Sequence, residues 1–136
     1  MIRLRAAQWE TVRREAEAAY PAECCGLLLG REEQITAVIP AANLRACEGN
    51  DMFEVDPQVR FEVERGARAG GDRLIGHYHS HPDHPAQPSA TDRAMAFEPN
   101  LIWLIVPVAG GSAGEPRAFR LCGEDVEELV VEIFPE

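Results

Sequence analysis

The residues from Gly76 to Asp92 supply histidine, aspartate and serine at spacings that suit metal-dependent hydrolysis. The segment reads G-H-Y-H-S-H-P-D-H-P-A-Q-P-S-A-T-D and holds all four histidines of the chain, three of them at alternate positions. In an extended strand, residues two apart share one face. His79 and His81 can therefore point their imidazoles at one position in space, as two ligands of a single zinc ion must.

A third ligand has to come from elsewhere, because a catalytic zinc ion takes three protein ligands and leaves its fourth position to water. The segment from Pro82 to Pro88 holds three prolines in seven residues. Proline lacks a backbone N–H and fixes φ, so the segment is predicted to be an irregular turn. Ser89 then has the composition of an N-cap, and residues 90–97 that of a short helix. Asp92 lies in its first turn and can reach back as the third ligand.

Simpler interpretations stand beside the metal site. Residues 89–92 read S-A-T-D, which is close to a capping box and favours a helix start without any metal. A single histidine in a strand is ordinarily a hydrogen-bonded core residue. Three on one apolar face would need three sets of buried partners, at about 1–3 kcal/mol for each bond left unmade, whereas a metal satisfies two at once. His77 is given no role at the centre itself, and His84 is expected at the surface or the rim.

These residues resemble a known family. Residues 79–92 match the H-x-H-x7-S-x-x-D signature of the JAMM (MPN-plus, Mov34-type) zinc metalloproteases, of the short prokaryotic type. Upstream, residues 21–30 read P-A-E-C-C-G-L-L-L-G and look like the family's P-x-E-x-C-G-x-L-x-G segment, which includes Glu23. Two separated motifs in the right order make the match specific, and it covers nearly the whole chain. Without the histidine segment, Glu23 would be interpreted as an ordinary solvated loop residue.

The resemblance implies a site and a fold. His79, His81 and Asp92 would bind zinc, with one Zn2+ per chain. Ser89 would help to hold the oxyanion, and Glu23 would be the general base. The implied fold is α/β: a cytidine-deaminase-like mixed β-sheet flanked by helices as an α-β-α sandwich. A length of 136 residues suits a single domain, so residues 1–136 are predicted to form one JAMM domain.

The predicted reaction is hydrolysis of an amide. Zinc lowers the pKa of bound water toward about 7, and Glu23 would take the water proton and return it to the leaving amine. JAMM enzymes, as the family implies, cut peptide or isopeptide bonds after the C-terminal Gly-Gly of ubiquitin or ubiquitin-like proteins. Compact members resemble peptidases of sulfur-carrier proteins of the ThiS and MoaD type. Because the chain is short, a sulfur-carrier tail is favoured as the substrate.

Residues 41–56 show no period and are predicted to form a long loop, and such loops are often functional. By resemblance, this is where JAMM enzymes contact the substrate tail, so Met52 and Phe53 are candidate substrate-binding residues. A plain connector is the alternative. For the whole chain, the alternative function is a non-catalytic MPN-type protein-binding scaffold, although such a protein is expected to have lost ligands.

Other classes are less compatible with the residues. A cysteine hydrolase could be built on Cys24 or Cys25, but core packing explains those thiols more simply. A nucleotide deaminase would need an H-x-E…P-C-x-x-C signature, which the chain lacks. The net charge of −10 and pI near 4.8 argue against a nucleic-acid partner. No apolar run suits a membrane span or a signal peptide, and the four cysteines form no disulfide framework, so a cytoplasmic protein is expected.

Local patterns predict the elements that must position the site. Apolar spacing predicts a helix over residues 6–19, and an N-cap at Asp56 with Pro57 after it predicts a second helix up to residue 69. Apolar runs predict strands over residues 25–29, 35–39, 73–79 and 101–108. Shorter strands are expected at residues 2–4, as a sheet edge, and at 117–121. Residues 126–134 are expected to form a closing strand, with a helix beginning at Glu127 as the alternative.

Overall fold

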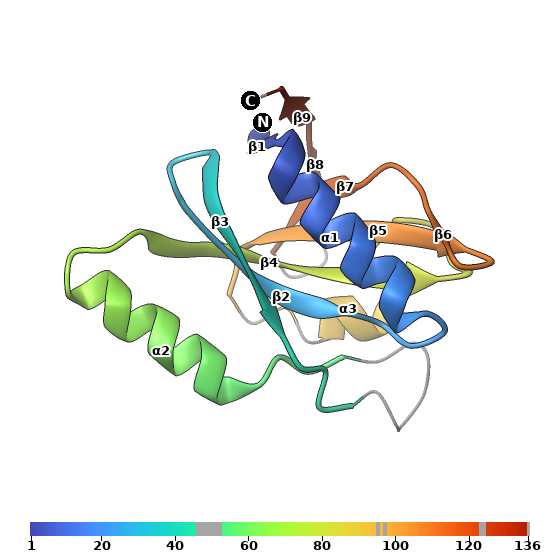
Figure 1. Ribbon diagram of the computed structural model, residues 1–136, viewed down its shortest axis with the longest axis horizontal. Coiled ribbons are helices and arrows are strands. Elements are labelled where there is room, and N and C mark those ends of the chain that lie inside the picture. Colours follow the sequence, from blue (N-terminus) through green and yellow to red (C-terminus); the bar gives the residue numbers. More distant parts are fainter. Residues whose placement is uncertain (46–52, 95, 97, 123–124, 136) are drawn as a thin grey trace.

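A mixed β-sheet with helices packed against it forms the centre of the protein (Figure 1). The computed structural model describes residues 1–45, 53–94, 96, 98–122 and 125–135. Within these residues the helices are α1 (Ala6–Ala19), α2 (Pro57–Arg68) and α3 (Ala90–Ala94). The strands are β1 (Ile2–Arg5), β2 (Cys25–Arg31), β3 (Gln34–Ala41), β4 (Arg73–Pro82), β5 (Ile102–Ala109), β6 (Ser112–Ala113), β7 (Arg117–Cys122), β8 (Asp125–Leu129) and β9 (Val131–Phe134).

The sheet combines parallel and antiparallel pairs. Its strand order is β8-β7-β5-β4-β2-β3-β1-β9, with the short β6 paired to β5. β4 runs parallel to β5, while β2 runs antiparallel to both β3 and β4. The site strand β4 therefore lies inside the sheet, between β2 and β5. The predicted mixed sheet flanked by helices is confirmed.

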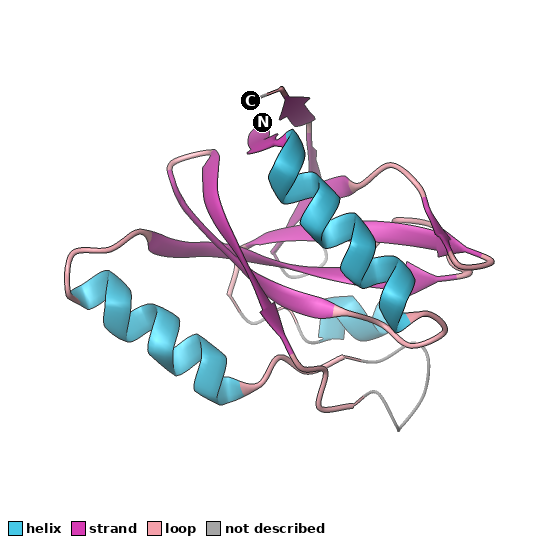
Figure 2. Ribbon diagram, viewed as in Figure 1, coloured by secondary structure: helices cyan, strands magenta, loops and turns pink. Residues whose placement is uncertain are grey.

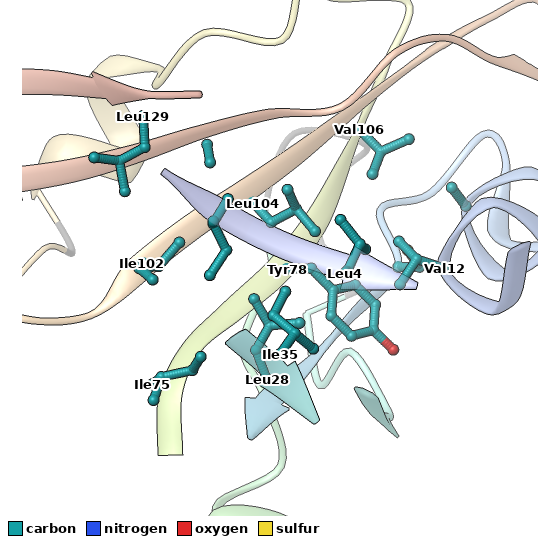
Figure 3. Packing of buried hydrophobic residues seen from close by; sticks show 14 of the residues in the cluster. Leu4, Val12, Leu28, Ile35, Ile75, Tyr78, Ile102, Leu104, Val106 and Leu129 are labelled. Carbon is teal, nitrogen blue, oxygen red and sulfur yellow. The ribbon is translucent and has the colours of Figure 1, made fainter. Parts of the chain in front are cut away.

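Alternation along β5 divides the core into two clusters. Leu104 and Val106 belong to the larger cluster, which also contains Val12 and Ala16 of α1. The intervening Trp103 and Ile105 belong to the smaller one. Since successive side chains of a strand point to opposite faces, the two clusters lie on opposite faces of the sheet. Figure 3 shows part of the larger cluster, with Tyr78 of β4 among Leu4, Val12 and Leu28.

The two longer helices form where the sequence predicts them. α1 covers residues 6–19, as the apolar spacing predicts, and lies across the sheet (Figure 2). Its Val12 and Ala16 are buried in the larger cluster. α2 begins at Pro57 because Asp56 caps it, its Oδ1 accepting the N–H of Gln58 at 2.9 Å. Among the described residues, no helix combines the length and the apolarity needed to cross a lipid bilayer.

Two expectations for the chain ends are wrong. Residues 2–4 are not a sheet edge, because β1 lies between β3 and β9 and buries Ile2 and Leu4 completely. The closing segment is neither one strand nor a helix: it forms β8 and then β9, separated by Val130. These two strands occupy opposite ends of the strand order, although one residue separates them in the chain. The sheet therefore curls until its two ends meet at Val130.

The register between β2 and β4 sets the geometry of the site. Cys25 pairs with His79, and Gly26 pairs with Tyr78. The Tyr78 ring packs so close to the backbone of residue 26 that only glycine fits there, since a Cβ atom would lie 2.3 Å from the ring. The ring of Tyr78 thus fits only opposite a glycine, and this pairing places the beginning of β2 beside His79 and His81.

Candidate metal centre

β4 carries His79 and His81 to one point on the face opposite α1. Both imidazoles are buried, and their Nε2 atoms lie 3.0 Å apart. The alternation that the sequence predicts is therefore present, and the strand continues through His81 to Pro82. Two ring nitrogens at this distance form a ready pair of ligands for one ion.

Asp92 reaches the same point from α3. Its Oδ2 lies 3.1 Å from Nε2 of His81, and its Oδ1 lies 3.4 Å from Nε2 of His79. The carboxylate also accepts the Ser89 N–H at 2.9 Å, while the Ser89 hydroxyl accepts the Asp92 N–H at 3.0 Å. These reciprocal bonds form a capping box. The simpler interpretation of this segment and the metal-site interpretation are thus compatible, because the capping box orients the carboxylate.

α3 ends at Ala94, short of the expected helix end at residue 97, and Met95 and Phe97 lie outside the described residues.

The donor set fits a zinc ion. Ligand bonds of about 2.0–2.2 Å at tetrahedral angles place ligand atoms roughly 3.3–3.6 Å apart. The three contacts that join His79, His81 and Asp92 measure 3.0, 3.1 and 3.4 Å. Two imidazole nitrogens and one carboxylate are also the donor types of known catalytic zinc sites. Small outward shifts would bring the three donors to zinc geometry.

Hydrogen bonding prepares His81 and Asp92 for this role. Nδ1 of His81 lies 2.9 Å from the carbonyl oxygen of Pro85, which can only accept, so the proton is on Nδ1 and Nε2 keeps its lone pair in the neutral ring. Burial raises the pKa of Asp92, but the adjacent His79 and His81 side chains and the hydrogen bond from the Ser89 N–H outweigh burial and hold that pKa well below its usual range. The carboxylate is therefore ionised at neutral pH.

Glu23 is brought to the histidines by β2. Its carboxylate oxygen and one nitrogen of each imidazole all lie within 4.8 Å of one another, and all three residues are buried. Ser80, which lies between the two histidines in the chain, holds the backbone next to Glu23 against β4. Its hydroxyl accepts the Cys24 N–H at 2.8 Å, and its own N–H donates to the Cys24 carbonyl at 3.2 Å. Sequence reasoning gave Ser80 no role, although its position inside the H-S-H motif was a signal.

The centre opens into a cleft of about 310 Å³. Glu23, His81 and Ser89 line it, together with His84 and residues of the proline-rich turn. A second cavity of about 440 Å³ lies beside α1 and is also lined by Glu23. The two cavities thus share the side chain of Glu23 in their linings.

The remaining candidate residues lie around this centre. His77 packs on the site face against Trp103, with ring centroids 4.3 Å apart, and burial lowers its pKa to about 3. His84 is exposed at the rim of the cleft. Met52 lies outside the described residues. Phe53 lies on His79, with ring centroids 4.2 Å apart and an angle of 15° between the rings.

The neighbouring thiols are core groups. Cys24 and Cys25 are buried, and burial raises the pKa of Cys24 to about 11 and that of Cys25 to about 12. The Cys25 thiol lies 3.6 Å from the carbonyl oxygen of Ala42, to which it donates. Since the thiolate is the nucleophile, neither group is prepared for attack at neutral pH.

Curated proteins resemble most of this chain. The desampylase of Haloferax volcanii is 35% identical over 115 residues, which are 83% of this chain and 79% of that protein. The CysO-cysteine peptidase of Mycobacterium tuberculosis is 28% identical over 123 residues, which are 89% of this chain and 83% of that protein. Each alignment covers most of this chain and most of its relative, so the similarity extends well beyond one shared motif.

Solved structures share the fold. A Desulfitobacterium hafniense protein superposes with a TM-score of 0.85 at 32% identity, covering 100% of this chain and 94% of its own. A JAB1/MPN domain protein of Archaeoglobus fulgidus gives a TM-score of 0.64 at 18% identity, covering 98% of this chain and 96% of its own. A sequence model described as prokaryotic homologs of the JAB domain matches residues 5–122. The chain therefore belongs to the prokaryotic JAB-domain proteins, a short JAMM-type family.

Proposed function

We propose that this protein is a zinc-dependent peptidase or isopeptidase that cleaves the amide bond after the C-terminal Gly-Gly of a ubiquitin-like or sulfur-carrier protein. One observation carries the proposal. Two imidazole nitrogens and the Asp92 carboxylate converge within 3.4 Å of one another at a cleft, and a second carboxylate, that of Glu23, lies beside them. Three ligands and a separate base are the parts that zinc-dependent hydrolysis requires.

The chain's own residues would divide the work. A zinc ion held by His79, His81 and Asp92 would polarise the scissile carbonyl and make water acidic enough to attack at neutral pH. The Glu23 carboxylate accepts the proton of the attacking water and returns it to the nitrogen of the leaving amine. The Ser89 hydroxyl uses an oxygen lone pair on the Asp92 N–H, so its hydrogen is available to donate to the carbonyl oxygen as charge develops there.

The names of the relatives support the substrate class. One relative is named a desampylase and the other a CysO-cysteine peptidase, so both names describe the removal of a group from a protein or a conjugate. A Gly-Gly tail suits this cleft, because glycine presents no side chain to Pro85 and Pro88, which line it. The scaffold alternative is less well supported, because every predicted ligand is present at the centre.

Mass spectrometry of defined adducts tests the proposal. Sulfur-carrier proteins joined through Gly-Gly to cysteine, to a short peptide or to a lysine side chain would be incubated with zinc-loaded protein. We expect the parent protein to release the carrier with a free C-terminal Gly-Gly, and the Glu23→Gln variant to release none. If every adduct stays intact while the protein holds one zinc per chain, the peptidase proposal is wrong. Less than one zinc per chain after gentle purification would favour the non-catalytic scaffold.

The second cavity predicts which leaving group is preferred. Glu15 and Glu23 both line it, with Ala18, Ala19 and Ala22 leaving room between them. Glu15 is half-buried and accepts a 2.7 Å hydrogen bond from the Tyr78 hydroxyl, so its charge is held close to the cavity. The free carboxylate of a cysteine leaving group would be repelled there, whereas the aliphatic chain of a lysine would not.

We therefore expect the lysine isopeptide adduct to be cleaved faster than the cysteine adduct. Glu15→Gln keeps an acceptor for Tyr78 and removes the charge. It should raise kcat/KM for the cysteine adduct about fivefold, corresponding to roughly 1 kcal/mol of like-charge repulsion, and leave the isopeptide adduct unchanged. Glu10→Gln, on the same helix but outside the cavity lining, is the matched control. Equal effects of Glu15→Gln on both adducts would contradict this assignment.

Alkylation separates the zinc mechanism from a cysteine hydrolase. Because burial raises the pKa of the Cys24 and Cys25 thiols, iodoacetamide at pH 7.5 should leave hydrolysis intact, whereas a zinc chelator should abolish it. Peptide mapping should show carbamidomethylation of the exposed Cys122, which verifies the reagent. Loss of activity together with a label on Cys24 or Cys25 would instead support a thiol nucleophile.

A further inference from the structure

The two histidines of the centre are held in different ways. A metal-binding imidazole is usually oriented by a hydrogen bond from its second nitrogen. His81 follows this rule, since its Nδ1 donates to the Pro85 carbonyl at 2.9 Å. Nδ1 of His79 is buried and meets no hydrogen-bond partner among the described residues. The orientation of the His79 ring must therefore come from another contact.

Aromatic packing supplies that contact. The ring of Phe53 stacks on His79 with centroids 4.2 Å apart and an interplanar angle of 15°. Trp103 meets the same imidazole edge-on, at 5.7 Å and 83°. A stacked ring and a second ring nearly perpendicular to the imidazole restrict its rotation about χ2. His79 is thus confined by shape, whereas His81 is confined by a hydrogen bond.

Phe53 is itself held at the base of the 42–56 loop. Asn43 and Val55 form a bridge between the two ends of that loop. The Asn43 side-chain oxygen accepts the Glu54 N–H at 2.9 Å, and the Leu44 N–H donates to the Glu54 carbonyl at 2.9 Å. The Asn43 amide also donates to the Glu23 carbonyl at 3.0 Å. Asn43 therefore holds both the backbone next to Phe53 and the backbone of Glu23, the proposed general base.

We propose that Phe53 is a positioning residue for His79, which sets the zinc affinity of the centre by holding the imidazole in its ligating orientation. It is not primarily a contact for the substrate tail, although the sequence first points to that role. The inference rests on the proposed metal centre. Its main measurement is zinc binding, which requires no substrate and no turnover.

Phe53→Leu keeps an apolar side chain and removes the flat face. Competition with a chromophoric chelator should show zinc binding about tenfold weaker, the loss typical when a group that orients a ligand is removed. At saturating zinc, KM for a cleavable carrier adduct should stay within twofold of the parent. Phe53→Trp restores a flat ring and should recover most of the zinc affinity.

Two leucine substitutions provide matched controls. Phe61 is 52% exposed on α2, so Phe61→Leu should change neither zinc affinity nor stability. Phe119 is 3% exposed in the cluster that Phe53 packs against, so Phe119→Leu should lower the unfolding free energy without weakening zinc binding. This variant separates loss of orientation from loss of core packing.

The outcomes distinguish the inference from the proposed function. Zinc affinity of Phe53→Leu within twofold of the parent overturns the positioning role, and a raised KM at unchanged zinc affinity assigns Phe53 to the substrate instead. Equal weakening by Phe119→Leu would also overturn the positioning role, because general destabilisation would then explain the effect. A parent protein that binds no zinc would overturn the proposed function itself.

Discussion

Replacing Glu23 by glutamine is expected to lower kcat by about 10²–10⁴-fold, the usual contribution of a general acid–base group. The substitution preserves size and one acceptor oxygen but removes the group that takes the proton of water. Glu23 also lines the cleft, and its carboxylate oxygen and one nitrogen of each histidine lie within 4.8 Å of one another, so no large rearrangement is needed for proton transfer. Zinc content should remain one ion per chain, since Glu23 is assigned to the proton and not to the metal.

The measurement pairs single-turnover cleavage of a carrier adduct with zinc analysis of the same preparation. Glu115→Gln, at an exposed position in the loop before β7, is the matched control and should behave as the parent. A Glu23→Gln protein that loses zinc would show that Glu23 is a ligand. Unchanged kcat would show that another group moves the proton.

Replacing Asp92 by asparagine should remove the metal. An amide oxygen is a far weaker ligand than a carboxylate, yet it can still accept the Ser89 N–H, so the capping box and α3 should persist. Zinc affinity should fall by more than about 100-fold, beyond the loss typical of an orienting group, and activity should fall with it. The two variants are therefore expected to differ in zinc content while both lose activity.

Zinc titration in the presence of a competing chelator, with circular dichroism as a check of folding, tests this expectation. Asp125→Asn on the exposed strand β8 serves as the control, because it makes the same chemical change away from the centre. Retention of tight zinc binding by Asp92→Asn would mean that the third ligand is another residue, with Glu23 as the nearest candidate.

Local patterns predicted most of the elements because each depends on neighbours in the chain. Apolar spacing places α1 at residues 6–19, and Asp56 with Pro57 places the beginning of α2. Where the prediction failed, long-range pairing decided. Nothing within residues 2–5 specifies whether β1 has a neighbour on one side or on both, and β9 joins it from the far end of the chain.

Sequence spacing alone was sufficient to predict two parts of the centre. Alternation in a strand requires His79 and His81 to share a face, and a capping box requires Ser89 and Asp92 to exchange hydrogen bonds; both are consequences of backbone geometry over two to four residues. The positions of Glu23 and Phe53, in contrast, depend on contacts between segments that are far apart in the sequence. Glu23 reaches the histidines only through the β2–β4 register, which depends on a tyrosine ring fitting opposite Gly26.

Phe53 stacks on His79 because Asn43 and Val55, which lie far from the histidines in the sequence, pair with each other beside it. Such contacts join segments tens of residues apart, where packing and close approach select the partner and spacing along the chain carries no information. The sequence by itself therefore determined the chemical groups and their local geometry. The tertiary structure alone decided that the Glu23 carboxylate lies beside the two histidines, that the Phe53 ring stacks on His79, and that a cavity lies on either side of Glu23.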